Sequence, residues 1–211
     1  NMLIIIFAAT LCILSIIFLC YIKEETRINR NKKEVILQIA SLFKNKALVL
    51  LFLHTFCTWA IIMSFAGYWL KDYMIHMHHY SESSALNLVE VYWASFLIAG
   101  LTIGYYIKGF SQCKTGLIFL SFIGFATFSI MAIPILFNYS GLAIVAILGG
   151  ISASSMVLGF SIITKIVNAE LSGTAIAVNN TFMVLGGWVG QVLFGLIVSS
   201  IRYGLFSLNP T

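Results

Sequence analysis

Two ionisable side chains interrupt long apolar stretches and are the first candidates for chemistry. His54 is followed by Thr55, Thr58 and Trp59, and Glu90 lies in the next apolar stretch. An imidazole or a carboxylate is costly to bury in an apolar segment, so it usually faces a cavity, where it can bind a solute or carry a proton. Two simpler interpretations stay open. His54 can be a neutral ring hydrogen-bonded to a neighbouring helix, and Glu90 can lie near enough to a surface to be hydrated.

A run of small and hydroxyl-bearing residues forms a second candidate group. It includes Ser152, Ser154 and Ser155, directly after Gly149 and Gly150. Small residues let helices approach closely, and hydroxyls can also line a polar cavity. The sequence leaves both explanations open.

The last apolar stretch combines amides with glycines. Asn180, Gly187 and Gln191 are spaced so that they share one face of a helix, which predicts a tightly packed, partly polar contact. Within this stretch the GxxxG spacing and the glycine that follows it predict close helix packing at Gly186, Gly190 and Gly195.

No arrangement typical of a catalytic or metal centre accompanies these residues. The serines from Ser152 to Ser155 lack the GxSxG turn that exposes a nucleophile. The histidines of segment 76–79 have no acidic or cysteine partner at ligand spacing, and the four cysteines form no CxxC pair. We therefore expect no enzymatic activity, no metal site and no cofactor.

The composition indicates which elements position the candidate residues. Of 211 residues, 60% are hydrophobic and only 9% are charged, and the mean hydropathy is +1.00. A soluble domain carries about 25% charged residues, whereas a membrane-spanning helix needs about 20 apolar residues in a row. The sequence therefore predicts an all-α, polytopic membrane bundle. Six transmembrane helices are predicted, over residues 2–22, 47–70, 85–107, 115–137, 141–164 and 174–201.

The basic residues are divided unevenly among the connections. Of the 12 Lys and Arg residues, all but Lys71 and Arg202 fall in the first, third and fifth connections. Basic loops are retained on the cytoplasmic side, so both chain ends are expected on the outer side of an inner or plasma membrane. The topology accounts for the net charge of +5, and no nucleic-acid partner is expected.

The predicted organisation has four parts. Residues 1–22 form the first transmembrane helix, 23–46 a basic cytoplasmic connection, 47–201 a five-helix bundle and 202–211 an outer-side tail. Apolar side chains between Val35 and Phe43 allow either a short amphipathic helix or a hydrated linker. Because the first residue is Asn1 and the tail stops without another span, we expect a piece of a longer protein.

The order of these parts resembles helices six to eleven of a Major Facilitator Superfamily transporter. The segment LSGTAIAVNNTFMVLGGWVGQVLFGLIV, residues 171–198, is similar to the eleventh helix of that family, with its initial glycine, mid-helix asparagine and glycine-rich second half. The long basic connection stands where the family joins its two six-helix halves. A weaker similarity covers GYYIKGFSQCK, residues 104–114, where the aspartate of the family's cytoplasmic motif is missing.

The resemblance implies most of the C-terminal half of a transporter, embedded in a lipid bilayer and lacking the N-terminal half and the last helix. Such a protein moves a small solute by alternating access around a central cavity. His54 and Glu90, as ionisable side chains within the apolar stretches, are the candidates for proton coupling. The resemblance gives as solute-binding candidates His54, Thr55, Thr58, Trp59, Ser152, Ser154, Ser155, Asn180 and Gln191.

The few charges inside the predicted helices favour a neutral or zwitterionic nutrient such as an amino acid. A symporter coupled to H⁺ or Na⁺ and a uniporter are both compatible with the sequence. Efflux of a hydrophobic drug is one alternative. The other is a membrane scaffold that transports nothing and binds partners through its GxxxG segment and its basic cytoplasmic connection.

Overall fold

The computed structural model describes residues 10, 12–13, 15, 32–133 and 137–202. The chain divides into two compact units, Asn1–Ile36 and Leu37–Thr211, and all the membrane helices described below belong to the second unit. The first predicted transmembrane helix, residues 2–22, lies outside the described residues except for four positions, and the tail 202–211 lies outside them except for Arg202.

Five helices among the described residues are long and apolar enough to cross a membrane. The predicted count of six is therefore one too high for this part of the chain, because the first helix falls outside it. No strand occurs in the described ranges. In chain order the elements of these five helices are α3 (Lys46–Ile61), η1 (Ile62–Trp69), α4 (Leu70–His78), α5 (Glu82–Tyr106), α6 (Phe110–Ala132), α7 (Tyr139–Ala153), α8 (Ser155–Ile166) and α9 (Ala169–Arg202).

Polar side chains set where several helices begin. Asn45 accepts a hydrogen bond from the backbone amide of Ala47 at the start of α3, at 3.0 Å. Asn138 accepts one from the amide of Gly141 at the start of α7, at 2.8 Å. These contacts satisfy amides that have no partner within the helix.

The second membrane helix is longer than the sequence indicated. It was expected to end at residue 70, but it continues to His78 as one 33-residue helix, with η1 as a π-helical segment in its middle. Leu70 and Met74 are buried, so tertiary packing extends the helix beyond the apolar run. His79 then ends it in the left-handed conformation, with φ of 58°.

A shorter helix, α2 (Lys32–Leu42), forms within the basic connection, of which residues 23–31 lie outside the described residues. A helix in this region was one of the two structures that the apolar spacing allowed. Leu42 at its end is buried and Leu37 is exposed.

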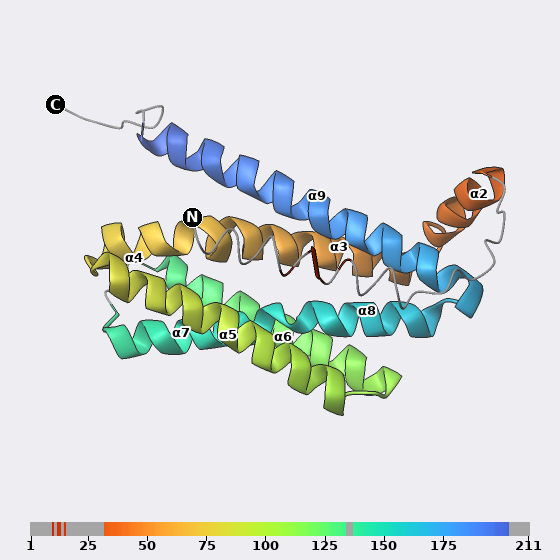
Figure 1. The fold of residues 1–211 in the computed structure, drawn as a ribbon, viewed down its shortest axis with the longest axis horizontal. Helices are drawn as coiled ribbons and strands as arrows, with labels where there is room; N and C mark the ends of the chain where they lie inside the picture. Colours follow the sequence, from red (N-terminus) through yellow and green to blue (C-terminus); the bar gives the residue numbers. More distant parts are fainter. Residues whose placement is uncertain (1–9, 11, 14, 16–31, 134–136, 203–211) are drawn as a thin grey trace. The chain divides into compact units, whose positions relative to one another are not determined.

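The segment α7–α8 lies at the centre of the second unit. It contacts α5, α6 and α3, and α9 runs beside α3 (Figure 1). One core cluster contains Met74 and Leu88, from α4 and α5, and the other contains Phe52 and Leu158, from α3 and α8. Apolar side chains also cover much of the outer surface, as expected of helices surrounded by lipid.

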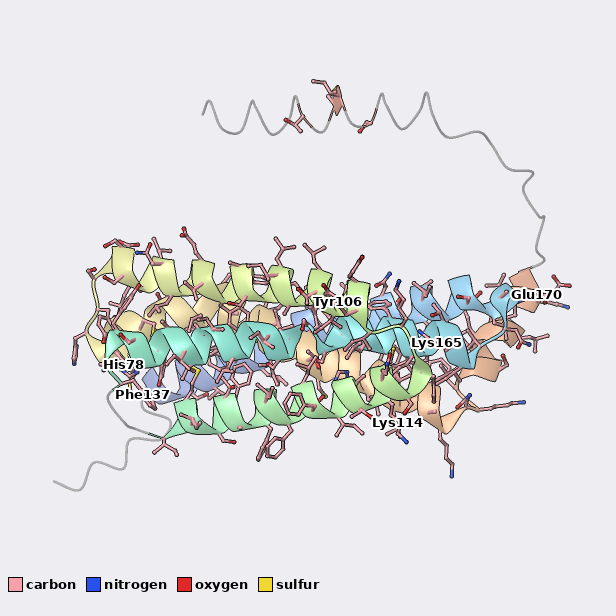
Figure 2. All side chains as sticks on the ribbon, turned by 90° about the horizontal axis from the view of Figure 1, so that it is seen from below. His78, Tyr106, Lys114, Phe137, Lys165 and Glu170 are labelled. Carbon is pink, nitrogen blue, oxygen red and sulfur yellow. The ribbon has the colours of Figure 1, made fainter. Side chains whose placement is uncertain are left out.

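Successive connections lie at opposite ends of the unit. Lys114, Lys165 and Glu170 lie at one end, whereas His78 and Phe137 lie at the other (Figure 2). The alternation that the charge count requires is therefore present.

Candidate functional site

A cavity of about 480 Å³ lies beside α7–α8, between α3 and α6. His54 and Thr58 reach it from α3, Ser121 from α6, and Ser152 and Ser155 from the two sides of the break between α7 and α8. The volume lies within the range of about 300–1,000 Å³ that is typical of small-molecule sites.

The α7–α8 break explains the placement of the two serines. Ser154 separates the helices, and its hydroxyl donates to the carbonyl of Ile151. Ser152 bonds in the same way to the carbonyl of Gly149, at 2.8 Å. Such bonds between a hydroxyl and the preceding turn satisfy the side chain locally and often accompany a bend in a helix.

The structure brings four of the predicted solute-binding residues together in the cavity and places the others elsewhere. Thr55 and Ser154 are buried outside the lining, Trp59 is partly buried against α9, Asn180 is exposed and Gln191 is partly buried. The four that line the cavity are His54, Thr58, Ser152 and Ser155. The proton-coupling candidate Glu90 lies on an exposed part of α5, outside the cavity.

His54 is held by a hydrogen bond across the helices. Its Nε2 lies 3.0 Å from Oγ of Ser121, and the Ser121 hydroxyl donates to the carbonyl of Leu117 at 2.8 Å. Because the serine has already donated its proton, its oxygen accepts from Nε2–H. The other ring nitrogen, Nδ1, is buried and has no hydrogen-bond partner in the structure. The hydrogen bond to a neighbouring helix, which was the simpler interpretation of His54, is therefore present.

Several cavity residues were not anticipated, and two of them carry a buried or partly buried hydroxyl. Ser121 lies in α6, a helix to which the sequence assigned no role, and Tyr92 comes from α5. The Tyr92 hydroxyl is buried and has no partner in the structure, although the ring is packed in the core. A polar interruption inside an apolar run was the available signal for both, but many other hydroxyls in the chain share it.

The cavity lining is mainly apolar. The described residues that form it include no Asp, Glu, Lys or Arg, and aromatic side chains from α6, Phe125 and Phe128, form part of its wall. Among the residues that the structure describes, no group of three or more His, Cys, Asp or Glu is placed to hold a metal ion.

The glycines of α9 lie where this helix approaches α3. A Cβ atom at Gly186 would overlap the carbonyl of Phe56, and one at Gly190 would lie 2.6 Å from Oγ of Ser64. Gly195, in contrast, has no neighbour within 4 Å of the position of a Cβ atom. Two of the three glycines thus bring α9 close to the backbone of α3.

These observations define an integral, multi-pass helical membrane protein with a cavity of solute size in its bundle. A comparison with protein families gives a match to the Major Facilitator Superfamily over residues 2–191. The chain belongs to this family, whose members are transporters and not enzymes. Comparisons with curated proteins and with solved structures gave no significant match.

Proposed function

We propose that this chain is part of a secondary transporter that moves a small solute by alternating access and binds it in the cavity beside α7–α8. The observation that carries the proposal is the meeting of His54, Thr58, Ser152 and Ser155 around one cavity. These side chains come from helices that are distant in the sequence. A cavity between broken or irregular membrane helices is a common setting for solute binding in transporters.

The lining helps to choose between the two solute classes that the sequence left open. A zwitterionic amino acid brings two charges, and the cavity residues in the described part of the chain offer no charged partner for either. Burying an unpaired charge is expensive. An uncharged solute is therefore the better match, and an amino acid is the second candidate because the serine hydroxyls can still bind its polar groups.

We propose H⁺ as the coupled ion and His54 as the residue that carries it. The ring lies in the cavity wall, and Nδ1 is left without a protein partner. Histidine changes its charge near neutral pH and is often used for proton transfer. Glu90, on an exposed part of α5, is not part of this arrangement, and coupling to Na⁺ is the alternative.

The proposed topology has residues 23–46 on the cytoplasmic side, the bundle 47–201 in an inner or plasma membrane and both chain ends outside. It rests on the charge count and on the alternation of connections between the two ends of the unit. The scaffold alternative loses support because Gly186 and Gly190 already pack against α3 within the same chain.

Accumulation of two probes by cells that express the protein tests the function. Nile red represents an uncharged hydrophobic solute, and radiolabelled phenylalanine represents a zwitterionic one. We expect Nile red accumulation to change with expression, to depend on an imposed pH gradient, and to lose that dependence in His54→Gln. Asn180→Ala, at an exposed position, is the matched control and should behave as the unchanged protein.

Transport of phenylalanine alone would favour the amino acid candidate. Transport of neither probe, with the protein shown to be present in the membrane, would contradict both solute classes. A dependence on Na⁺ that persists in His54→Gln would reject the proposed coupling.

A further inference from the structure

We infer that Tyr92 selects the solute, because its hydroxyl donates a hydrogen bond to an uncharged oxygen of the molecule bound in the cavity, such as a carbonyl oxygen. This inference rests on the proposed function, since it takes the cavity beside α7–α8 as the solute site. It adds a specificity-determining residue and a substrate class, namely uncharged solutes that carry an oxygen acceptor.

The first observation is the state of the Tyr92 hydroxyl. Tyr92 belongs to α5, lines the cavity and is only 2% exposed. Its hydroxyl oxygen is buried and has no hydrogen-bond partner among the described residues. A buried hydroxyl without a partner is costly, and nearly all such groups in folded proteins are paired. A molecule bound in the cavity can supply the missing partner.

The second observation is that close packing fixes the position of the Tyr92 ring. A Cβ atom at Gly149 of α7 would lie 2.9 Å from Cε2 of Tyr92, and one at Gly150 would overlap the Tyr92 carbonyl. The ring also meets Trp93 edge to face, with 5.9 Å between the ring centroids. The hydroxyl is therefore held in place before a solute binds, which lowers the entropic cost of forming the bond.

A second, much smaller cavity of about 10 Å³ borders the same ring, and it is a poor source of a partner. Apart from Tyr92 and Thr127, the described residues of its lining are apolar, and the Thr127 hydroxyl already donates to the carbonyl of Ile123 at 2.8 Å. This volume is at the lower limit for one water molecule, which would need two to four polar partners. The larger cavity is therefore the side from which the hydroxyl gains its partner.

The third observation concerns the chemistry of that partner. A neutral phenol is a good hydrogen-bond donor, whereas the hydroxyls of Ser121 and Ser152 already donate to backbone carbonyls and offer only acceptors. The lining residues that the structure describes include no Lys or Arg to pair with a carboxylate. Because an unpaired buried charge is expensive, the group that accepts from Tyr92 is an uncharged oxygen.

Three compounds with the same phenyl ring separate the acceptor from shape and charge. Acetophenone carries a carbonyl oxygen, α-methylstyrene has a CH₂ group in place of that oxygen, and benzoate is an anion. The reporter is the native Cys57, which lines the cavity. Its alkylation by N-ethylmaleimide is followed by peptide mass spectrometry on the full chain in lipid nanodiscs.

A compound that occupies the cavity should slow alkylation of Cys57, roughly threefold at twice its dissociation constant. Each compound is compared with itself in different variants, so its partition into lipid cancels. In the unchanged protein both uncharged compounds should protect the thiol, and benzoate should not.

Tyr92→Phe removes the donor and keeps the ring, and the hydroxyl has no partner in the described structure to lose. The dissociation constant of acetophenone should rise roughly fivefold, which corresponds to one hydrogen bond. That of α-methylstyrene should stay the same or fall, because this compound cannot form the bond. A merely structural role of Tyr92 would weaken both compounds. Tyr106→Phe, at a position that is 73% exposed and outside the lining, is the matched control and should bind all three as before.

Four results would overturn the inference: no protection by acetophenone, protection by benzoate as strong as that by acetophenone, unchanged affinity for acetophenone in Tyr92→Phe, or equal weakening of both uncharged compounds in that variant. Any of these in a protein that transports Nile red would leave the proposed function in place. A selective loss of acetophenone binding in a protein that transports neither Nile red nor phenylalanine would support the role of Tyr92 in binding while rejecting the proposed function.

Discussion

At the scale of single residues, the contact between His54 and Ser121 is the most informative part of the cavity. The Ser121 oxygen accepts a hydrogen bond from the His54 ring, while the Ser121 hydroxyl donates one to the carbonyl of Leu117. The serine therefore fixes which ring nitrogen carries the proton and leaves Nδ1 as the nitrogen that can accept one. The Ser121 hydroxyl on α6 thus selects the tautomer of His54 on α3.

Replacing Ser121 should lower stability and reduce the pH dependence of transport, whereas replacing another serine of α6 should not. In Ser121→Ala, Nε2 of His54 loses its acceptor, and we expect a stability loss of about 1–2 kcal/mol together with reduced dependence of transport on pH. Ser111→Ala, at an exposed position of the same helix outside the cavity lining, should change neither property. Thermal unfolding in detergent measures the first and uptake under a pH gradient the second; equal effects of the two variants would contradict this account.

His79, which follows α4 in the left-handed conformation, is a position where a substitution should increase stability. His79 has φ of 58°, which is unfavourable for a residue with a Cβ atom. His79→Gly should therefore stabilise the protein, by about 0.5–1 kcal/mol, and raise its melting temperature. His76→Gly, inside the helix, should lower the melting temperature by a comparable amount. A fall in both variants would show that the His79 side chain makes contacts that outweigh the backbone strain.

At the scale of elements, the glycines of α9 determine how closely it approaches α3. Gly186→Ala and Gly190→Ala place a methyl group against the α3 backbone and against Ser64, respectively, and each should cost about 1–3 kcal/mol of stability. Gly195→Ala meets no neighbour and should be neutral or should stabilise the helix, by up to about 1 kcal/mol. Melting temperatures of the three variants test this, and similar losses at all three positions would mean that helix flexibility matters more than close contact.

The elements themselves were largely predictable, but their rotation about their own axes was not. Apolar runs of membrane length indicated every long helix that the structure describes, because the bilayer requires them. In α6, however, Ser121 and Ser129 line the cavity and Thr127 is buried outside the lining, although each is a hydroxyl in an apolar run. Only packing against neighbouring helices distinguishes them.

The amides of α9 show the same limit. The sequence favoured Asn180 because it shares a face with Gly187 and Gln191, yet Asn180 is exposed and its neighbour Asn179 is completely buried. Facing patterns are clear when one side of a helix is polar and the other apolar. Here the lipid and the protein core are both apolar, so the pattern that normally reveals which face of a helix points inward is weak. The ends of helices such as α4 depend on burial in the same way.

At the scale of the whole molecule, the connections carry the information about topology. Figure 2 shows Lys114 and Lys165 at one end and His78 at the other, and the uneven distribution of Lys and Arg predicts that the first of these ends faces the cytoplasm. In the proposed alternating-access cycle, this assignment decides which end of the bundle opens to the cytoplasm. It is therefore the feature on which any account of transport direction depends.

Labelling from the two sides of the membrane tests the assignment. Single cysteines are introduced by Ser83→Cys, near the His78 end, and by Lys108→Cys, near the opposite end, in a chain whose native cysteines are replaced by serine or alanine. In intact cells a membrane-impermeant maleimide should label only the cysteine at position 83, because the connection that contains Lys108 is retained in the cytoplasm. After permeabilisation both positions should react, which serves as the control for accessibility. Labelling of position 108 alone in intact cells would invert the orientation, place both chain ends inside and contradict the positive-inside argument for this chain.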